Sequence, residues 1–120
     1  MDAGKDIAKA SEPIRDAVHY LIRRYSDPWT VKELSARVGM SMYHFFRTSR
    51  RETRCTPIQY LNRYRIEQAK GLLAETRVPV EQIAAQVGIP NHKYFPRLFH
   101  KRTGFSPRAY RARAQAGRAA

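Results

Sequence analysis

An internal repeat is the feature that most constrains this chain. Residues 31–60 and residues 80–110 carry one pattern of apolar, small and turn-forming residues. With a shift of 49, Val31, Ala36, Val38 and Gly39 correspond to Val80, Ala85, Val87 and Gly88. With a shift of 50, Phe45, Arg47, Thr53, Pro57 and Tyr60 correspond to Phe95, Arg97, Thr103, Pro107 and Tyr110. Such self-similarity indicates two copies of one supersecondary unit. We therefore expect two similar contacts with a partner that is itself repetitive.

The first copy carries the signals of two short helices separated by a tight turn. Thr30 and Glu33 have capping-box spacing, so that each side chain can bond the backbone N–H of the other. Gly39 follows and can adopt the left-handed conformation that ends a helix. Ser41 is then placed to cap a second helix over residues 42–53. Two such helices form a helix-turn-helix, although any helical bundle contains similar pairs.

The second copy follows the same plan but contains a proline in its second helix. Pro79 is placed at the first position of the earlier helix. Asn91 can cap the later helix, and two alternatives then remain open for Pro96. If the helix begins directly after Asn91, Pro96 lies in its interior and costs ~3 kcal/mol. If it begins near Lys93, Pro96 falls in the first turn and is tolerated. In either case the second helix of this copy should start later than its counterpart in the first copy, or be kinked.

Helical signals also flank and join the two copies. Apolar residues at helical spacing predict a helix between Ser11 and Asp27. Thr56 as N-cap, Pro57 as first and Gln59 as third helical residue predict the start of a linker helix of 18 residues that ends at Ala74. Its length would be about 27 Å. This is close to the roughly 34 Å between successive major-groove faces of DNA, so the length is consistent with two units one helical turn apart. Gly71 inside it indicates either close packing or a tolerated defect.

Together with a short last helix that begins at Ser106 and Pro107, these signals predict an all-α fold of about seven helices, with two helix-turn-helix subdomains joined by a long linker helix. The expected divisions are a flexible N-terminus at 1–10, a first subdomain at 11–55, the linker helix at 56–76, a second subdomain at 77–111 and a flexible tail at 112–120.

The charge balance indicates a polyanionic partner. Lys and Arg number 23 against 10 Asp and Glu, a net charge of +13. A small domain needs a charge of only about 2–8 for solubility, so nucleic acid is expected first and an anionic membrane second. The single cysteine, Cys55, excludes an internal disulfide and suits a reducing cytoplasm. Residues 1–13 lack the apolar run of a signal peptide, and no stretch reaches the ~18 apolar residues of a membrane span.

Three stretches carry a resemblance to a known family. They are IEQAKGLL in the linker, and IAAQVGI and YFPRLFHKRTGFSPRAYR in the second copy. In these, and over residues 12–111 as a whole, the chain resembles the DNA-binding region of the AraC/XylS family of bacterial transcription regulators. The resemblance implies seven helices and two recognition helices, laid into adjacent major-groove segments of double-stranded DNA. It also implies a monomer on DNA that activates transcription through contact with RNA polymerase.

The candidate DNA contacts follow from the two recognition helices. Side chains early in such a helix, on the face away from its core, reach base edges. The candidates are Met42, Tyr43, Phe46, Arg47, Arg50 and Arg51 in the first copy, and His92, Lys93, Tyr94, Arg97, Lys101 and Arg102 in the second. Arg47 can donate two hydrogen bonds to guanine. The resemblance places Tyr43, Phe46 and Arg47 at base-contacting positions, although aromatic residues at helical spacing are usually core. Phe45 lies on the opposite, inward face and is predicted to be core.

Pro96 is one departure from the family pattern, and two others concern the first copy. Thr48 and Ser49 occupy positions that are usually apolar, which predicts looser packing. Arg54 replaces a usual glycine and adds a candidate phosphate contact.

The function expected from the sequence is a cytoplasmic, sequence-specific DNA-binding transcription regulator and activator. The alternative is a DNA-binding fragment of a larger, ligand-responsive regulator. An enzyme, an RNA binder or a membrane binder is a third class. The sequence has no glycine-rich phosphate loop, no nucleophile–base pair and no metal-ligand cluster around His92 or Cys55. No enzymatic activity, catalytic residue, cofactor or metal is therefore expected.

Overall fold

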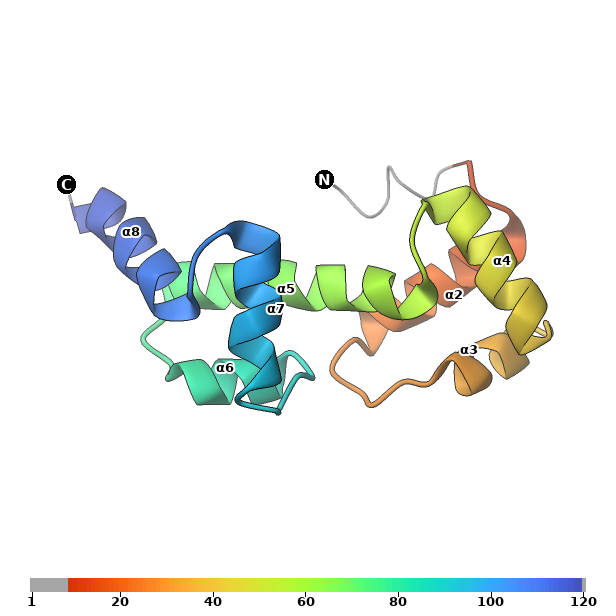
Figure 1. The fold of residues 1–120 in the computed structure, drawn as a ribbon, viewed down its shortest axis with the longest axis horizontal. Helices are drawn as coiled ribbons and strands as arrows, with labels where there is room; N and C mark the ends of the chain where they lie inside the picture. The colour runs from red at the N-terminus through yellow and green to blue at the C-terminus, as the bar shows by residue number, and fades with distance from the viewer. Residues whose placement is uncertain (1–8, 120) are drawn as a thin grey trace. The chain divides into compact units, whose positions relative to one another are not determined.

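The computed structural model describes residues 9–119, with side chains up to residue 117, and this part of the chain forms seven α-helices and no strand. Residues 1–8 of the predicted flexible N-terminus lie outside the described residues. The helices, labelled in Figure 1, are α2 Glu12–Arg23, α3 Val31–Arg37, α4 Met42–Thr53, α5 Pro57–Glu75, α6 Val80–Gln86, α7 Tyr94–Thr103 and α8 Pro107–Ala119. The all-α class predicted from the sequence is confirmed.

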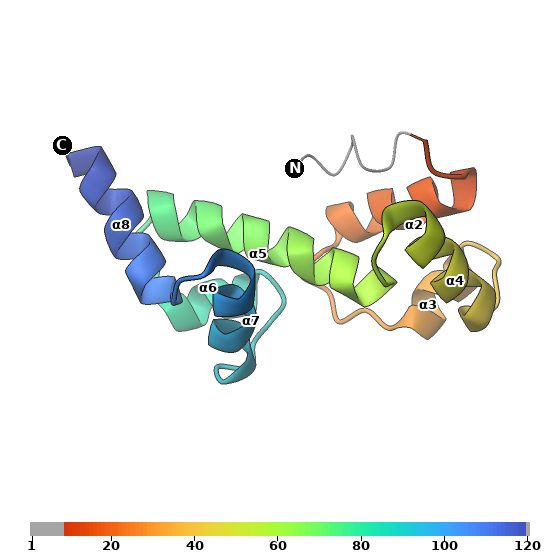
Figure 2. The same cartoon turned by 45° about the horizontal axis from the view of Figure 1, so that its top comes forward.

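The chain divides inside α5 into two compact units, one ending at Tyr64 and the other beginning at Arg65. In the first unit, α2, α3 and α4 pack together with the beginning of α5 (Figure 2). Ile14, Leu34 and Phe45 are each almost completely buried in its core. Phe45 thus takes the inward position predicted for it. Helix α3 has only seven residues, and isolated helices shorter than about 12–15 residues are marginal, so its stability depends on this packing.

The second unit repeats this arrangement with α6, α7, α8 and the rest of α5. Ile83 of α6 and Phe95 and Phe99 of α7 are buried. Phe99 also meets Tyr110 of α8 edge to face, with ring centroids 5.4 Å apart, a favourable geometry for aromatic pairs. Phe95 occupies the position of Phe45 in the repeat, so both units bury a phenylalanine at the same repeat position.

Side chains close two of the helix starts as predicted, with one difference. At α5, Gln59 Oε1 accepts from the backbone N–H of Thr56 at 2.9 Å, and Thr56 Oγ1 accepts from the backbone N–H of Gln59 at 3.1 Å. At α3, Thr30 Oγ1 accepts from the backbone N–H of Glu33 at 3.1 Å, but the Glu33 carboxylate accepts from the Thr30 hydroxyl. The capping box predicted for α3 is therefore formed only in one direction.

The start of α7 combines features of the two alternatives for Pro96. Asn91 Oδ1 accepts hydrogen bonds from the backbone N–H groups of Lys93 and Tyr94, both at 3.0 Å. The helix begins at Tyr94, so that Pro96 is its third residue. The backbone N–H of Phe95 already donates to the Asn91 carbonyl at 2.9 Å, so the missing N–H of Pro96 leaves the next bond of this kind, to the carbonyl of His92, unmade. In α6, Pro79 is the N-cap rather than the first helical residue.

Helix α8 is longer than predicted. It extends to Ala119, whereas the sequence predicted a flexible tail at residues 112–120. The Arg111 guanidinium donates to the carbonyl of Leu73 at 3.2 Å. Gln115 Nε2 donates to the carbonyls of Leu73 and Thr76 at 3.2 and 3.0 Å. The acceptors lie in the last turn of α5 and directly after it, where carbonyls lack helical partners. These bonds attach α8 to the end of α5.

Candidate nucleic-acid interface

Helix α4 is placed for contact with a partner by the turn that precedes it. Gly39 ends α3 with a φ of 73°, in the left-handed region that glycine adopts without strain. Ser41 Oγ then accepts from the backbone N–H of His44 at 3.1 Å and starts α4 at Met42. Because α4 packs against α2 and α3 through the side that carries Phe45, its opposite side faces outward.

All six candidates of the first unit are exposed, and most of them lie along this outward side of α4. Tyr43 is 72% exposed and Phe46 is 38% exposed, which settles the question that the sequence left open for these two aromatic residues. Thr48 and Ser49 take the buried positions despite their polarity. The exposed candidates of the first unit are Met42, Tyr43, Phe46, Arg47, Arg50 and Arg51.

Two of the exposed side chains interact directly. Arg47 Nη1 donates to the hydroxyl of Tyr43 at 3.2 Å, and its guanidinium carbon lies 5.6 Å from the centroid of the Tyr43 ring. Residues four apart on a helix lie on one face. The guanidinium therefore already lies along the outward side of α4, where it can donate to a partner.

The second unit presents its candidates differently. Tyr94, Arg97, Lys101 and Arg102 are exposed on α7. His92 and Lys93 are also exposed. They lie in the turn that precedes α7, whereas the sequence predicted them at the start of the helix itself. The repeat aligns them with Met42 and Tyr43, which are helical. The reason is Pro96: Asn91 accepts from the N–H of Tyr94 as Ser41 accepts from that of His44, but Pro96 has no N–H to donate to the carbonyl of His92.

Both candidate helices end in basic residues. Arg50 and Arg51 lie in the last turn of α4, and Lys101 and Arg102 in the last turn of α7. Cations are stabilising at a helix C-terminus, where the helix dipole is negative. These four residues therefore stabilise the ends of their helices.

Glu52 is a residue that sequence reasoning missed. It is the only acidic residue of α4, and its carboxylate accepts two hydrogen bonds from Ser11. The available signal was its charge, which is opposite to that of the surrounding arginines.

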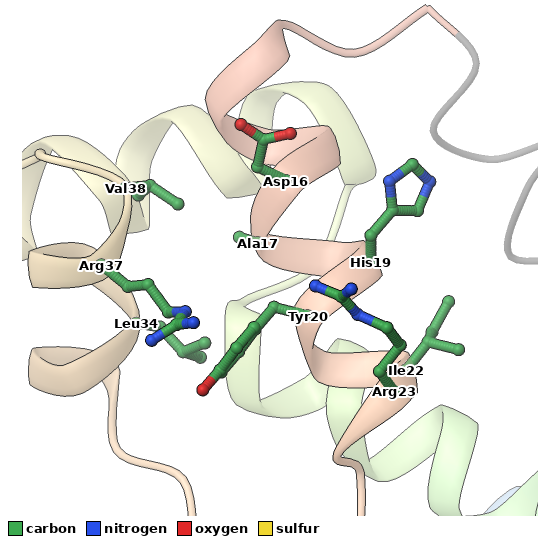
Figure 3. Close-up of a pocket in the computed structure, with 9 residues that line it drawn as sticks. All are labelled: Asp16, Ala17, His19, Tyr20, Ile22, Arg23, Leu34, Arg37 and Val38. Atoms are coloured by element: carbon green, nitrogen blue, oxygen red, sulfur yellow. The ribbon is translucent and has the colours of Figure 1, made fainter.

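A groove of about 710 Å³ also lies between α2 and α3 (Figure 3). Asp16, His19 and Arg23 of α2 line it, together with Arg37 of α3. The guanidinium carbon of Arg37 lies 3.5 Å from the centroid of the Tyr20 ring, and that of Arg23 lies 5.9 Å from it. None of the candidate DNA contacts lines this groove, which is therefore a separate feature of the first unit.

The described residues offer little for other classes of site. In residues 9–119 no three His, Cys, Asp or Glu side chains gather as a metal site would require. Over the same range, none of the helices has the length and apolar character needed to cross a membrane.

These features define a protein with two helix-turn-helix units, each with an exposed and basic second helix. The family described as "Helix-turn-helix domain" matches residues 34–113. The chain belongs to the AraC/XylS family of helix-turn-helix regulators.

Individual relatives agree with this assignment. The chain is 35% identical over 96 residues to the HTH-type transcriptional regulator YisR of Bacillus subtilis (strain 168), covering 80% of this chain and 33% of that protein. It is 32% identical over 101 residues to the bifunctional transcriptional activator/DNA repair enzyme AdaA of the same organism, covering 84% of this chain and 48% of that protein. This chain thus spans between a third and a half of the length of these curated relatives.

A solved structure extends the comparison to three dimensions. The DNA-binding domain of the global transcriptional factor AdpA, in complex with a target DNA, superposes with a TM-score of 0.86. The two are 31% identical, over 91% of this chain and 98% of that one.

Proposed function

We propose that this chain is a sequence-specific binder of double-stranded DNA and acts in transcription regulation, as an activator. The observation that carries the proposal is the outward side of α4. There Tyr43, Phe46 and Arg47 are exposed on the second helix of a helix-turn-helix, the element that enters the major groove in this motif. Arg47 would donate two hydrogen bonds to a guanine, and Tyr43 and Phe46 would contact thymine methyl groups or sugars.

The net charge of +13 supports the same function. Arg50, Arg51, Lys101 and Arg102 would bind phosphates beside each recognition helix. The N-terminal ends of α5 and α8 would attract further phosphates, because the helix dipole is positive there. The relative AdpA was solved with a target DNA on a domain that resembles this one throughout.

We further propose that both units bind adjacent major-groove segments on one side of the duplex, as a monomer. The second unit would contribute less to base recognition, because His92 and Lys93 lie in a turn rather than on the helix. Contact with RNA polymerase, a cytoplasmic location and the absence of enzymatic activity belong to the same proposal. They rest on the resemblance to the family's regulators.

A second candidate is the DNA-binding part of a larger regulator that responds to a ligand. The observation in its favour is that the chain spans only 33% of YisR and 48% of AdaA. The reading frame on either side of the coding sequence would distinguish the two candidates. A further domain encoded in frame would favour the larger regulator.

Selection of bound sites from random duplex DNA, followed by a footprint, tests the proposal. We expect a preferred sequence protected over two successive major-groove segments on one face of the helix. Protection of a single short segment would contradict the use of both units. Binding without any sequence preference, or tighter binding to single-stranded RNA, would contradict the proposal itself.

A further inference from the structure

A carboxylate in the last turn of α4 needs an explanation. Glu52 follows Arg51 directly and precedes Arg54 by two residues, on a helix proposed to lie against DNA. A negative charge there repels the phosphate backbone and weakens the attraction that the neighbouring arginines provide. Its place in the fold must therefore supply a compensating benefit.

Both oxygens of the Glu52 carboxylate bind Ser11, the residue directly before α2. Glu52 Oε1 accepts from the backbone N–H of Ser11 at 2.7 Å, and Oε2 accepts from the Ser11 hydroxyl at 2.8 Å. Ser11 is the N-cap of α2, yet its hydroxyl makes no capping bond within that helix. Hydrogen bonds to a carboxylate are stronger than those between neutral groups. The end of α4 thus holds the beginning of α2.

The sequence of α2 explains why the acceptor comes from another helix. In a capping box, the third residue of a helix accepts from the N–H of the N-cap, as Gln59 does for Thr56 in α5. The third residue of α2 is Ile14, which is 1% exposed and belongs to the core. An apolar side chain cannot accept a hydrogen bond. Glu52 supplies the acceptor that Ile14 cannot.

The second unit provides the natural comparison. The repeat aligns Glu52 with Arg102, which is basic. The helix that precedes α6, as α2 precedes α3, is the continuous α5, so the second unit has no helix start at the place where α2 begins in the first. The acid is present only in the unit that has a helix start at this place.

We propose that Glu52 is a positioning residue that fixes the C-terminal end of α4 against α2, and so orients the exposed face that carries Tyr43 and Arg47. It does not itself contact DNA. Its effect on affinity rests on the proposed DNA-binding function, whereas its effect on the orientation of α4 is a property of the free protein.

The two possible roles of Glu52 predict opposite signs in a binding experiment. If Glu52 is only a surface charge, Glu52→Gln removes repulsion and tightens binding to any duplex. If it positions α4, Glu52→Gln weakens the preferred site by about fivefold or more, because it loses charge-assisted bonds, while binding to a scrambled duplex is not weakened. Asp16→Asn is the matched control, since it removes one negative charge from an exposed position of α2.

The measurement is fluorescence anisotropy of the full chain with the duplex selected by the wild type and with a scrambled duplex, at one salt concentration. A loss confined to the selected duplex in Glu52→Gln, but not in Asp16→Asn, supports the positioning role. Equal changes in affinity in Glu52→Gln and Asp16→Asn overturn the positioning role. If Glu52→Gln does not fold, Ser11→Ala removes one of the two bonds, and unchanged affinity for the selected duplex then overturns the role.

A second measurement separates this inference from the function on which it rests. If the wild type selects no preferred duplex, the proposed function fails, and the backbone amide NMR spectrum of free Glu52→Gln decides the positioning role. Shifts that reach the amides of Tyr43 and Arg47 support it. Shifts confined to the neighbours of Ser11 and Glu52 overturn it.

Discussion

Arg47 and Tyr43 form a pair on the exposed side of α4, with Arg47 Nη1 3.2 Å from the Tyr43 hydroxyl oxygen. An arginine side chain carries about 2 kcal/mol of rotamer entropy, and ordering it on binding opposes affinity. A guanidinium that is already held along the helix loses less of this entropy. The pair is therefore the first target for mutagenesis.

Replacement of Arg47 by Ala should reduce the preference for the selected duplex. We expect a loss of about 1–3 kcal/mol on that duplex and little change on a scrambled one, because Arg47 is proposed to contact a base. Anisotropy titrations with both duplexes measure the difference. Arg50→Ala is the control, since a phosphate contact is lost equally from both. Equal losses in Arg47→Ala would assign Arg47 to the backbone instead.

Replacement of Tyr43 by Phe should act through Arg47. The variant keeps the ring and removes the hydroxyl that accepts from the guanidinium, so we expect a loss of about 0.5–1 kcal/mol on the selected duplex. In the Arg47→Ala background the same change should cost nothing further. A double-mutant cycle measures this coupling. Additive losses would show that the Tyr43 hydroxyl contacts DNA independently.

Binding should weaken steeply with salt. If about six phosphates are neutralised, the logarithm of the association constant should fall with the logarithm of salt concentration at a slope near −5. Arg51→Ala should reduce the magnitude of that slope by about one. Titrations between low and physiological salt give both slopes. A flat dependence would be incompatible with phosphate binding by the basic residues of α4 and α7.

The backbone at Arg54 should be a source of strain. Its φ is 65°, and the aligned residue of the second unit is Gly104 with a φ of 82°. A non-glycine residue in the left-handed region costs about 1–2 kcal/mol, so Arg54→Gly should raise the free energy of unfolding by about 1 kcal/mol. Urea unfolding followed by Trp29 fluorescence measures it, since Trp29 is the single tryptophan and lies in the first unit.

Gly39→Ala is the converse control in the same unit. Gly39 has a φ of 73°, and no atom lies within 4 Å of an added Cβ. Any destabilisation therefore comes from the backbone conformation alone, and should again be about 1 kcal/mol. If Arg54→Gly lowers stability instead, the Arg54 side chain contributes more than the strain costs.

The attachment of α8 to α5 should depend on Arg111. Arg111→Ala leaves the carbonyls of Leu73 and Val78 without this donor, and we expect a loss of about 1–3 kcal/mol. Amide hydrogen exchange should accelerate in α8 more than in α4. Arg113→Ala is the control, because Arg113 stacks on the exposed Phe105 at 4.8 Å. Equal protection in the two variants would mean that the Gln115 hydrogen bonds and the apolar contacts hold α8 without Arg111.

The sequence predicted the parts of this fold that depend on near neighbours. The bounds of α4, Met42–Thr53, were predicted correctly because Ser41 caps its start. The start of α5 at Pro57 follows from the Thr56–Gln59 capping box. Phe45 was placed in the core by its spacing. Each signal involves residues at most four apart, a distance over which pattern and capping rules act.

The candidate site was predicted less completely. All twelve candidates are exposed, but their roles as DNA contacts remain predictions. The exposure of Phe46 depended on how α4 packs against α2 and α3. The place of His92 and Lys93 depended on where α7 begins around Pro96, which has no N–H to donate to the carbonyl of His92. The pattern left both questions open.

The sequence alone thus determined the number and order of the helices, their repeat, and the basic face of each second helix. Only the tertiary structure decided how the helix ends are completed. Glu52 binds Ser11 across 41 residues, and Gln115 binds the Leu73 carbonyl across 42. The acceptor or donor that completes a helix end in each case is brought near by core packing, and spacing along the chain carries no record of it.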